Sequence, residues 1–422
     1  MRVLLVGSGG REHALAQTLA RSPHLSTLFI APGNPGTEAL GVNVAIGAQD
    51  IPALVSFALE QQVDLVVPGP EAPLVEGLAD ACASVGLPCA GPTQAAAQLE
   101  GSKEFTKEIC DAAGIPTARW ESFDRAENAI AYVRECGAPI VVKADGLAAG
   151  KGVVVAATVE EAEAAITDMM TGGSLGAAGS RVVIEDCLVG EEVSLFAFCA
   201  GETAYLIGAA QDHKRVGDGD TGPNTGGMGA VSPPKGFGPI EQEAALDLLV
   251  RPMLREMVRR GTPFRGVIFA GLMLTDHGPS LIEYNVRFGD PEAEALLPRL
   301  QSDLLPALSA LADDKLDGVS VAFSSQASVC VVMAARGYPV APEKGAVIHG
   351  LEDAAAMEGV QVYQAGTMRN MAGELVVSGG RVLAVTALAD TVRQARERAY
   401  AAVGAISWDG AHWRKDIGAR AL

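Results

Sequence analysis

Positive charge is the scarcest property of this sequence. Its 422 residues contain 51 acids but only 32 bases, which gives a formal net charge of −19, and only nine of the bases are lysines. A chain with this balance repels nucleic acids and anionic membrane surfaces, so we expect neither as a partner. An anionic ligand would have to be met by a local concentration of cations.

Long apolar runs and paired cysteines are also missing. No stretch of about 18 residues is free of charges, Gly or Pro, so no membrane span is predicted. The start of the chain, from Met1 to Gly7, is typical of a strand and not of a signal peptide. The seven cysteines are odd in number and form no Cys-x-x-Cys pair, which predicts reduced thiols in a cytoplasmic protein.

Two classes of catalytic site find no support in the sequence. We see no Ser/His/Asp spacing for a covalent hydrolase and no His/Cys cluster for zinc. What the chain does have is 49% hydrophobic residues, enough for sizeable cores. A length prior of roughly 150 residues per domain suggests about three domains. We expect them at 1–100, 101–325 and 326–422, with a lid subdomain at about 118–190.

The first hundred residues alternate short apolar runs with helical spacing. Such alternation predicts a Rossmann-like parallel sheet with crossover helices, hence an α/β domain. The expected strands are Val3–Val6, Thr27–Ala31 and Val63–Val67, and the expected helices are Glu12–Arg21, Ile51–Gln61 and Leu74–Val85.

The central block has longer helices and a glycine-bearing hairpin. Strands Ile140–Lys143 and Val153–Ala156 flank a glycine-rich loop, whereas 212–229 is polar, rich in Gly and predicted to be a functional loop without packed elements. After residue 326 the pattern predicts a small β-rich α+β domain. The expected helices are Lys103–Ala113, Ala126–Cys136, Gln242–Arg260 and Thr391–Gly404.

Three segments could bind phosphate. The first, Gly7-Ser8-Gly9-Gly10, lies between a strand and a helix start, where backbone N–H groups favour an anion. A dinucleotide fingerprint would need a third Gly where Glu12 stands and an acid after the second strand, which ends in Ala31-Pro32. A phosphate of a smaller ligand fits better, and a purely structural tight turn is the alternative.

The second segment is the hairpin, in which Lys143 ends a strand and Lys151 lies in the glycine loop. Backbone amides and ammonium groups together suit a polyphosphate. The spacing is not that of a P-loop, and solvated lysines on a flexible surface hairpin are the alternative.

The third segment gives the clearest indication of a functional site. A strand period of two places Glu283, Asn285 and Arg287 on one face of a strand. A carboxylate and an amide oxygen suit Mg²⁺ bound to phosphate, and the guanidinium can neutralise a phosphoryl group or a carboxylate. A solvent-facing ion pair is the alternative, but the Phe288–Glu292 turn adds a second group of acids nearby.

Lysines concentrate at these segments. Four of the nine lie in or beside the candidate phosphate sites, namely Lys103, Lys143, Lys151 and Lys214. The last of these belongs to Asp212-His213-Lys214-Arg215, whose single histidine we take as structural.

These features together resemble the ATP-grasp superfamily, and several longer motifs resemble its phosphoribosylamine–glycine ligase family over essentially the whole chain. The motifs are Gly9–Ala14, Ala31–Asn34, Gly69–Leu74, Gly101–Lys103, Lys143–Gly152, Gln211–Arg215, Gly222–Gly229 and Arg287–Glu292. The resemblance implies ATP-dependent joining of glycine to 5-phosphoribosylamine through glycyl phosphate, with ATP and Mg²⁺ or Mn²⁺ as cofactors. It also implies a central ATP-grasp fold with a mobile lid. We expect a monomer or weak dimer.

The resemblance also assigns roles to residues. ATP phosphates are assigned to Lys103, Lys143 and the loop with Gly150, Lys151 and Gly152; the adenosine is assigned to Glu185, Cys187, Leu188 and Glu192. Glu283 and Asn285 are assigned to the metal; Arg287, Lys214, Asp212 and Asp290 to catalysis at the glycine end; and Gly9, Gly10, Glu12, Asn34, Pro70 and Glu71 to phosphoribosylamine.

Two rivals stay open. A carboxylating ligase similar to biotin carboxylase would share Lys143 and the Glu283/Asn285 pair, but not Gly9–Ala14 or Arg287–Glu292. A nucleotide-sensing protein without ligase activity is the rival of a different class. One departure from many ATP-grasp enzymes is the absence of an acid in Phe269–Met273, so that either fewer protein ligands hold the metal or water and phosphate complete its shell.

Overall fold

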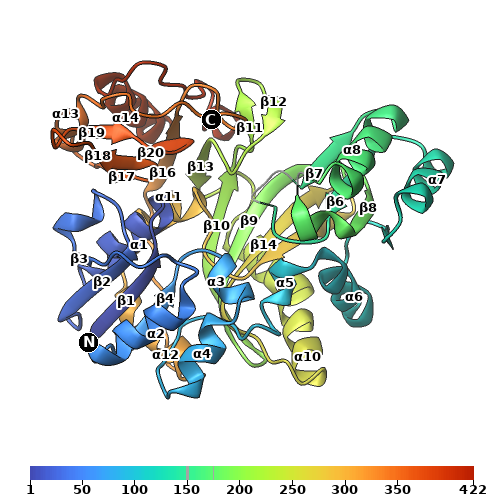
Figure 1. Ribbon diagram of the computed structural model, residues 1–422, viewed down its shortest axis with the longest axis horizontal. Helices are drawn as coiled ribbons and strands as arrows, with labels where there is room; N and C mark the ends of the chain where they lie inside the picture. Colours follow the sequence, from blue (N-terminus) through green and yellow to red (C-terminus); the bar gives the residue numbers. More distant parts are fainter. Residues whose placement is uncertain (149–151, 174) are drawn as a thin grey trace.

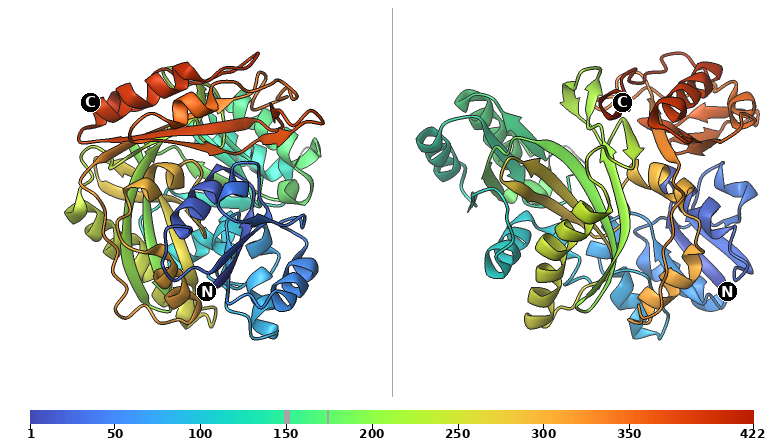
Figure 2. Two further views of the ribbon diagram at one scale, coloured as in Figure 1. Left: turned by 90° about the vertical axis from the view of Figure 1, so that its left-hand side faces the viewer. Right: turned by 180° about the vertical axis from the view of Figure 1, so that it is seen from behind.

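The computed structural model describes residues 1–148, 152–173 and 175–422 and has three lobes around a common centre (Figure 1). Gly150 and Lys151, both predicted to contact phosphate, lie outside the described residues. Seen from behind, the N-terminal and C-terminal parts lie side by side, and the segment 120–186 lies on the opposite side (Figure 2). No helix in the described ranges has both the length and the apolar character that a membrane crossing needs.

The N-terminal part is the predicted parallel α/β sheet, with strand order β3-β2-β1-β4. Apolar residues cover both faces, as parallel sheets require. Its elements are β1 (Arg2–Gly7), α1 (Gly10–Leu19), β2 (Thr27–Pro32), β3 (Val42–Asn43), α2 (Ile51–Glu60), β4 (Leu65–Pro68), α3 (Ala72–Val75), α4 (Leu78–Ser84) and α5 (Gln98–Gly101).

The helix expected over Leu74–Val85 was wrong, because the structure has α3 and α4 in its place. Gly77 separates them with a φ of +95°, a left-handed conformation that ends one helix and that glycine adopts without strain.

The centre of the molecule is one antiparallel sheet of eight strands, in the order β15-β14-β9-β10-β13-β16-β20-β17. This sheet runs without a break from the central part into the C-terminal part. Its strands are β9 (Glu191–Ala200), β10 (Thr203–Asp212), β13 (Gly229–Ser232), β14 (Arg265–Thr275), β15 (Gly278–Asn285), β16 (Ala327–Ala334), β17 (Val360–Gln364) and β20 (Arg381–Ala389).

Helices and a small hairpin accompany this sheet. They are α6 (Lys103–Ala113), α9 (Pro239–Ala245), α10 (Arg251–Arg259), α11 (Glu292–Leu296), α12 (Leu304–Ala312), α13 (Leu351–Ala355), α14 (Val392–Ala405), β18 (Thr367–Arg369) and β19 (Leu375–Val377). The helix expected over Gln242–Arg260 contains a π-helical turn at Leu246–Val250. Pro252, which follows this turn, lacks the N–H that a regular α-helical bond would use.

A separate four-stranded sheet, in the order β5-β8-β6-β7, forms the lobe at 120–186. The predicted hairpin is confirmed: Ile140 lies opposite Ala156 and Lys143 lies opposite Val153. The elements are β5 (Trp120–Phe123), α7 (Ala126–Cys136), β6 (Ile140–Ala144), β7 (Val153–Ala156), α8 (Val159–Thr171) and β8 (Val182–Asp186).

The polar segment 212–229 is more ordered than expected. The prediction of a stretch without packed elements was wrong, because β11 (Arg215–Gly217) and β12 (Thr221–Asn224) pair as an antiparallel hairpin. A glycine-rich sequence does not indicate such a hairpin, because the residues that contact the hairpin come from another part of the chain.

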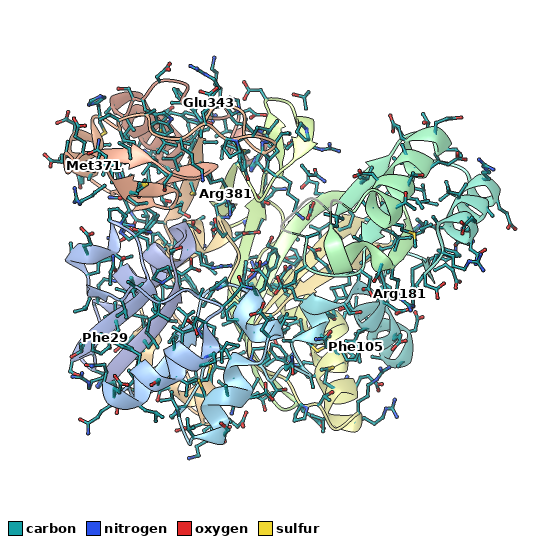
Figure 3. The ribbon with its side chains drawn as sticks, in the orientation of Figure 1. Phe29, Phe105, Arg181, Glu343, Met371 and Arg381 are labelled. Atoms are coloured by element: carbon teal, nitrogen blue, oxygen red, sulfur yellow. The ribbon has the colours of Figure 1, made fainter. Side chains whose placement is uncertain are left out.

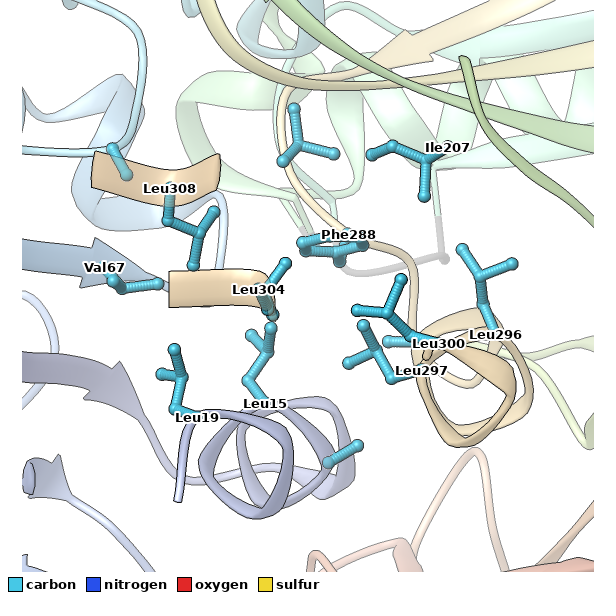
Figure 4. Packing of buried hydrophobic residues seen from close by; sticks show 14 of the residues in the cluster. Leu15, Leu19, Val67, Ile207, Phe288, Leu296, Leu297, Leu300, Leu304 and Leu308 are labelled. Atoms are coloured by element: carbon cyan, nitrogen blue, oxygen red, sulfur yellow. The ribbon is translucent and has the colours of Figure 1, made fainter. Parts of the chain in front are cut away.

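One apolar cluster packs α1 of the N-terminal part against the large sheet, and Leu74 and Leu99 belong to a second one. Leucines of α1 and α12 interlock in the first cluster, and Phe288 packs beside them (Figure 4). Because Phe288 directly follows Arg287, this packing also fixes the end of the strand that carries the candidate metal ligands.

Leu15→Ala tests this junction. Leu15 is buried between α1 and α12, so its truncation should destabilise the protein by about 2–5 kcal/mol, measured by urea unfolding. Leu59→Ala is the matched control, because Leu59 is half exposed on α2 and should cost less than about 0.5 kcal/mol. Equal losses for the two variants would contradict a junction built on Leu15.

Candidate active site

A cavity of about 430 Å³ lies where the N-terminal, central and C-terminal parts meet. The predicted site residues that line it are Pro70, Glu71, Lys103, Lys143, Gly152, Glu185, Asp212, Lys214, Glu283, Asn285, Arg287 and Asp290. The structure therefore brings together segments that are up to 220 residues apart in the chain.

Buried lysines line one side of the cavity. Glu185 lies between two ammonium groups, with Lys143 Nζ 2.8 Å from its Oε1 and Lys107 Nζ 2.9 Å from its Oε2. Lys107 also donates to Thr117 Oγ1 over 2.6 Å. Burial lowers the pKa of Lys107, and the Glu185 charge acts against that effect. Sequence reasoning missed Lys107, although it follows Lys103 by four residues and so shares its helix face.

Lys103 stands at the start of α6, next to the glycine loop. Its Nζ donates to the carbonyl of Gly146 over 2.9 Å, and burial lowers its pKa. Asp145 secures this contact by accepting from the hydroxyl of Ser102 and from the backbone N–H of Glu104, each over 3.0 Å. Asp145 and Gly146, at the start of the loop, are thus attached to the helix that carries two of the cavity lysines.

The end of β15 carries the polar face that the strand period predicted. Burial alone would raise the pKa of Glu283, but nearby ammonium groups hold it below its ordinary value. Those ammonium groups belong to Lys214, Lys143 and Lys103. Asn285 is also buried, and its Nδ2 has no hydrogen-bond partner among the described residues. An anionic oxygen on β15 therefore lies within a cluster of positive charge.

Arg287 joins this strand to the N-terminal part. Its Nη2 is 2.6 Å from Glu100 Oε1, and its Nε is 3.2 Å from Glu71 Oε2. Burial raises the pKa of Glu100 to about 7 despite the opposing charge of Arg287. Burial acts in the same direction on Glu71, but Arg287 and Arg11 prevail and lower its pKa to about 2. Glu100 is a second cavity residue that sequence reasoning missed, because no motif marks it.

Carboxylates gather at the end of β10. Burial and the neighbouring Glu292 raise the pKa of Asp212 well above its ordinary value. Burial would lower the pKa of Lys214, but Glu192 and other acids hold it above its ordinary value. Lys214 forms a close ion pair with Glu192, which was expected at the ribose.

The C-terminal part contributes residues that the sequence did not indicate. Arg381, on β20, points towards the centre of the molecule (Figure 3). Its Nη1 donates to the carbonyls of Gly226 and Asp290 over 2.6 and 2.7 Å and lies 3.0 Å from Asp290 Oδ1. Tyr338 accepts from the N–H of Gly226 over 3.1 Å. Neither residue was predicted to belong to the site.

Other predicted residues lie outside this cavity wall: Gly9, Gly10, Glu12, Asn34, Cys187, Leu188 and Glu192. Gly9 is nevertheless close, since a Cβ on it would lie 3.4 Å from Asp290 Oδ2. Glu12 accepts from the N–H of Gly9 and from Arg11 Nε. Asn34 Nδ2 donates to the carbonyls of Ser8 and Gln364, so that its amide joins the N-terminal and C-terminal parts.

The oxygen donors of β15 fit a hard divalent cation. Glu283 offers a carboxylate and Asn285 an amide oxygen on the same face, and Mg²⁺ commonly takes few protein ligands. In the part of the chain that is described, no three His, Cys, Asp or Glu residues form a metal-binding group. Phosphate oxygens and water would therefore have to complete the shell.

The fold is found in solved structures. The biotin carboxylase domain of the Hydrogenobacter thermophilus 2-oxoglutarate carboxylase has a TM-score of 0.75 at 16% identity, covering 98% of this chain and 91% of that one. Biotin carboxylase of Campylobacter jejuni has the same score at 14% identity, covering 99% and 94%. The central part also matches the model of the phosphoribosylglycinamide synthetase ATP-grasp domain, over residues 101–293. The protein is therefore an ATP-grasp protein.

Further comparisons identify the family within the ATP-grasp proteins to which the chain belongs. Models of the N and C domains of phosphoribosylglycinamide synthetase match residues 1–100 and 328–420. The phosphoribosylamine–glycine ligase of Brucella melitensis is 54% identical over 100% of this chain and 98% of its own length. A crystal structure of the Thermotoga maritima ligase has a TM-score of 0.86 at 32% identity, covering 99% of this chain and 100% of that one. The chain belongs to the phosphoribosylamine–glycine ligase family.

A buried acid behind the cavity gives a pH-dependent prediction. Both oxygens of Glu294 are buried without a donor among the described residues, and its carboxyl contacts that of Asp290. Burial and the Asp290 charge raise the pKa of Glu294 well above its ordinary value. A carboxyl group whose pKa is higher in the folded than in the unfolded protein stabilises the fold at pH values below its unfolded-state pKa. That contribution is lost as the pH rises through its folded-state pKa.

Glu294→Gln should therefore raise the melting temperature more at pH 8 than at pH 5, because an amide needs no proton. Thermal unfolding of both proteins across this range is the measurement. Glu343→Gln is the control, since Glu343 lies at the surface and its change should be small at every pH. A Glu294→Gln effect of equal size at both pH values would contradict a protonated Glu294.

Proposed function

We propose that this protein joins glycine to 5-phosphoribosylamine with ATP, yielding glycinamide ribonucleotide, ADP and phosphate. The observation that carries the proposal is the cavity itself. It places three lysines around Glu283 and lies beside the glycine-rich start of α1. Full-length relatives whose names state this activity support it.

The first step activates a poor electrophile. A carboxylate oxygen of glycine attacks the γ-phosphorus of ATP, the bond to the β-phosphate oxygen breaks, and ADP and glycyl phosphate result. Phosphoryl transfer of this kind needs positioning and charge neutralisation but no enzyme nucleophile. Lys103 and Lys143 bind the phosphates, next to Gly146 and Gly152, which line the same cavity.

The second step forms the new bond. The amine nitrogen of phosphoribosylamine attacks the carbonyl carbon of glycyl phosphate, phosphate leaves with the electrons of the C–O bond, and the nitrogen loses a proton. Arg287 contacts the phosphoryl group or the glycine carboxylate. Asp212, Lys214 and Asp290 close the glycine end, and buried carboxylates there are suited to hold an amine.

We assign adenosine and phosphoribosylamine to different ends of the cavity. Glu185 and the backbone of Cys187 and Leu188 bind the adenine, and Glu192 binds the ribose. Binding of the ribose requires the ion pair between Glu192 and Lys214 to open. Phosphoribosylamine lies against Gly9, Gly10, Pro70 and Glu71, and the contacts of Asn34 and Glu12 hold that end in shape. A divalent cation, Mg²⁺ or Mn²⁺, bound by Glu283 and Asn285 would supply further positive charge to the phosphates.

The remaining proposals concern the whole chain. We propose domains at 1–100, 101–325 and 326–422 with a lid at about 118–190, which the positions of the matched family models and the separate sheet at 120–186 support. We also propose a cytoplasmic monomer or weak dimer that binds neither nucleic acid nor membrane, in keeping with its net charge of −19.

The direct test is ADP release from ATP-Mg²⁺ in the presence of glycine and freshly generated phosphoribosylamine. Omission of either substrate should abolish the full rate. ADP formation indifferent to both would overturn the ligase. Bicarbonate-dependent ADP release in their place would favour the biotin carboxylase-like alternative.

Glu283→Gln should lower kcat by about 100-fold or more while the fold survives, because it removes a negative charge from a pre-formed polar face. Steady-state rates and thermal unfolding measure the two effects. Glu343→Gln, a loss of the same charge at the surface, should leave kcat unchanged. An unaltered kcat in Glu283→Gln would place the metal elsewhere.

Asp212→Asn should raise the KM for glycine by about tenfold and leave the KM for ATP within about twofold, because Asp212 lies at the glycine end. Initial rates with each substrate varied in turn measure this difference. The opposite pattern would assign the segment after β10 to the nucleotide.

A further inference from the structure

We infer that the C-terminal tail, residues 412–420, is a clamp that positions the β11–β12 hairpin, and that Arg414 is its central positioning residue. The inference rests on the proposed function, because the hairpin directly follows the segment that carries Asp212 and Lys214 at the glycine end. Neither the tail nor the tip of the hairpin lines the cavity as described.

Arg414 is the centre of the contact. It is 1% exposed, although it lies only eight residues from the end of the chain. Its Nη1 donates to the carbonyl of Arg215, on β11, over 3.1 Å and to Asp220 Oδ1, in the turn, over 2.8 Å. One buried guanidinium therefore holds both a strand and the turn of the hairpin.

Further bonds from the tail surround this contact. Asp416 receives Arg414 in a bidentate pair, over 2.8 and 2.7 Å, and also accepts from the N–H of Gly219 over 2.9 Å. The N–H of Lys415 donates to Asp218 Oδ1 over 2.7 Å. All three residues of the turn, Asp218 to Asp220, are thus bound by the tail.

The turn needs such support. Asp220 has a φ of +55°, a left-handed conformation that a residue with a side chain adopts at a cost. Arg420 forms a second, close ion pair with Asp220, and His412 Nε2 lies 3.0 Å from the carbonyl of Val216. The tail thus contacts all three residues of the turn and the carbonyl groups of Arg215 and Val216 on β11.

The tail itself is fixed to a rigid element. Tyr400, on α14, donates to the carbonyl of Arg414 over 2.7 Å and accepts from the N–H of Ile417 over 3.0 Å. Arg396, one turn earlier on the same helix, donates to the carbonyls of Lys415 and Ile417. The clamp is therefore anchored in the C-terminal part.

The base of the hairpin leads into the site. Thr225 donates to the carbonyl of Lys214 from both its N–H and its hydroxyl, each over 2.8 Å. Asn224, Thr225 and Lys214 all line the cavity. A tilt of the hairpin would move these three side chains together, whereas the nucleotide lysines Lys103 and Lys143 belong to other elements.

Arg414→Lys and Asp220→Asn test the clamp from its two sides. Each should raise the KM for glycine at least fivefold, leave the KM for ATP within twofold, and speed hydrogen exchange of the backbone amides at 215–224. The double variant should be no worse than the more affected single one, because the two residues act as one unit. Asp220→Asn keeps the test open if Arg414→Lys does not fold, since Asp220 lies in the turn of the hairpin and belongs to none of the apolar clusters of the described residues.

Arg336→Lys is the matched control. Arg336 also pairs with two acids in the C-terminal part, Glu343 and Asp409, but at the surface, so neither measurement should change. Unchanged exchange at 215–224 would overturn the clamp, and faster exchange with an unchanged KM for glycine would overturn its role in positioning. A wild-type protein without glycine-dependent ADP release would instead refute the proposed function, while the exchange experiment would still report on the clamp.

Discussion

The pairing of buried cations with buried carboxylates is the constraint on which the rest of the site depends. Lys143, Lys107 and Arg287 each lie against an acid that is itself shielded from water. A buried charge without such a partner would be strongly unfavourable, and each of these three cations has a buried carboxylate partner. A polyanionic ligand would bind the same ammonium and guanidinium groups through its own oxygens in place of these carboxylates.

This constraint explains why so few lysines suffice in a chain with so many acids. The cations are held by three parts of the fold, and the N-terminal part supplies both Glu71 and Glu100 to Arg287 of the central part. Arg381 does the same from the C-terminal side by binding the loop of Asp290. The ion pairs of the site therefore also hold the three parts of the fold together.

The sequence predicted the site where chemistry leaves a local pattern. Strand periodicity predicted a polar face with Glu283 and Asn285, and two apolar runs predicted the hairpin whose first strand carries Lys143. Glu100, Arg381 and Tyr338 were missed because their roles come from long-range packing, which a single sequence does not display. The β11–β12 hairpin was missed for the same reason, since Arg414, about 200 residues away, supplies its support. The single helix expected over Leu74–Val85 failed because apolar spacing took no account of Gly77.

The continuous eight-stranded sheet has a consequence for synthesis of the chain. Strand β13 pairs with β10 on one side and with β16 on the other, and β16 is made much later. Until β16 has left the ribosome, β13 presents an open edge to other nascent chains. The alanine- and valine-rich β16 thus completes a surface that would otherwise favour aggregation, and premature termination before residue 327 should yield a product that is prone to aggregate rather than a smaller working enzyme.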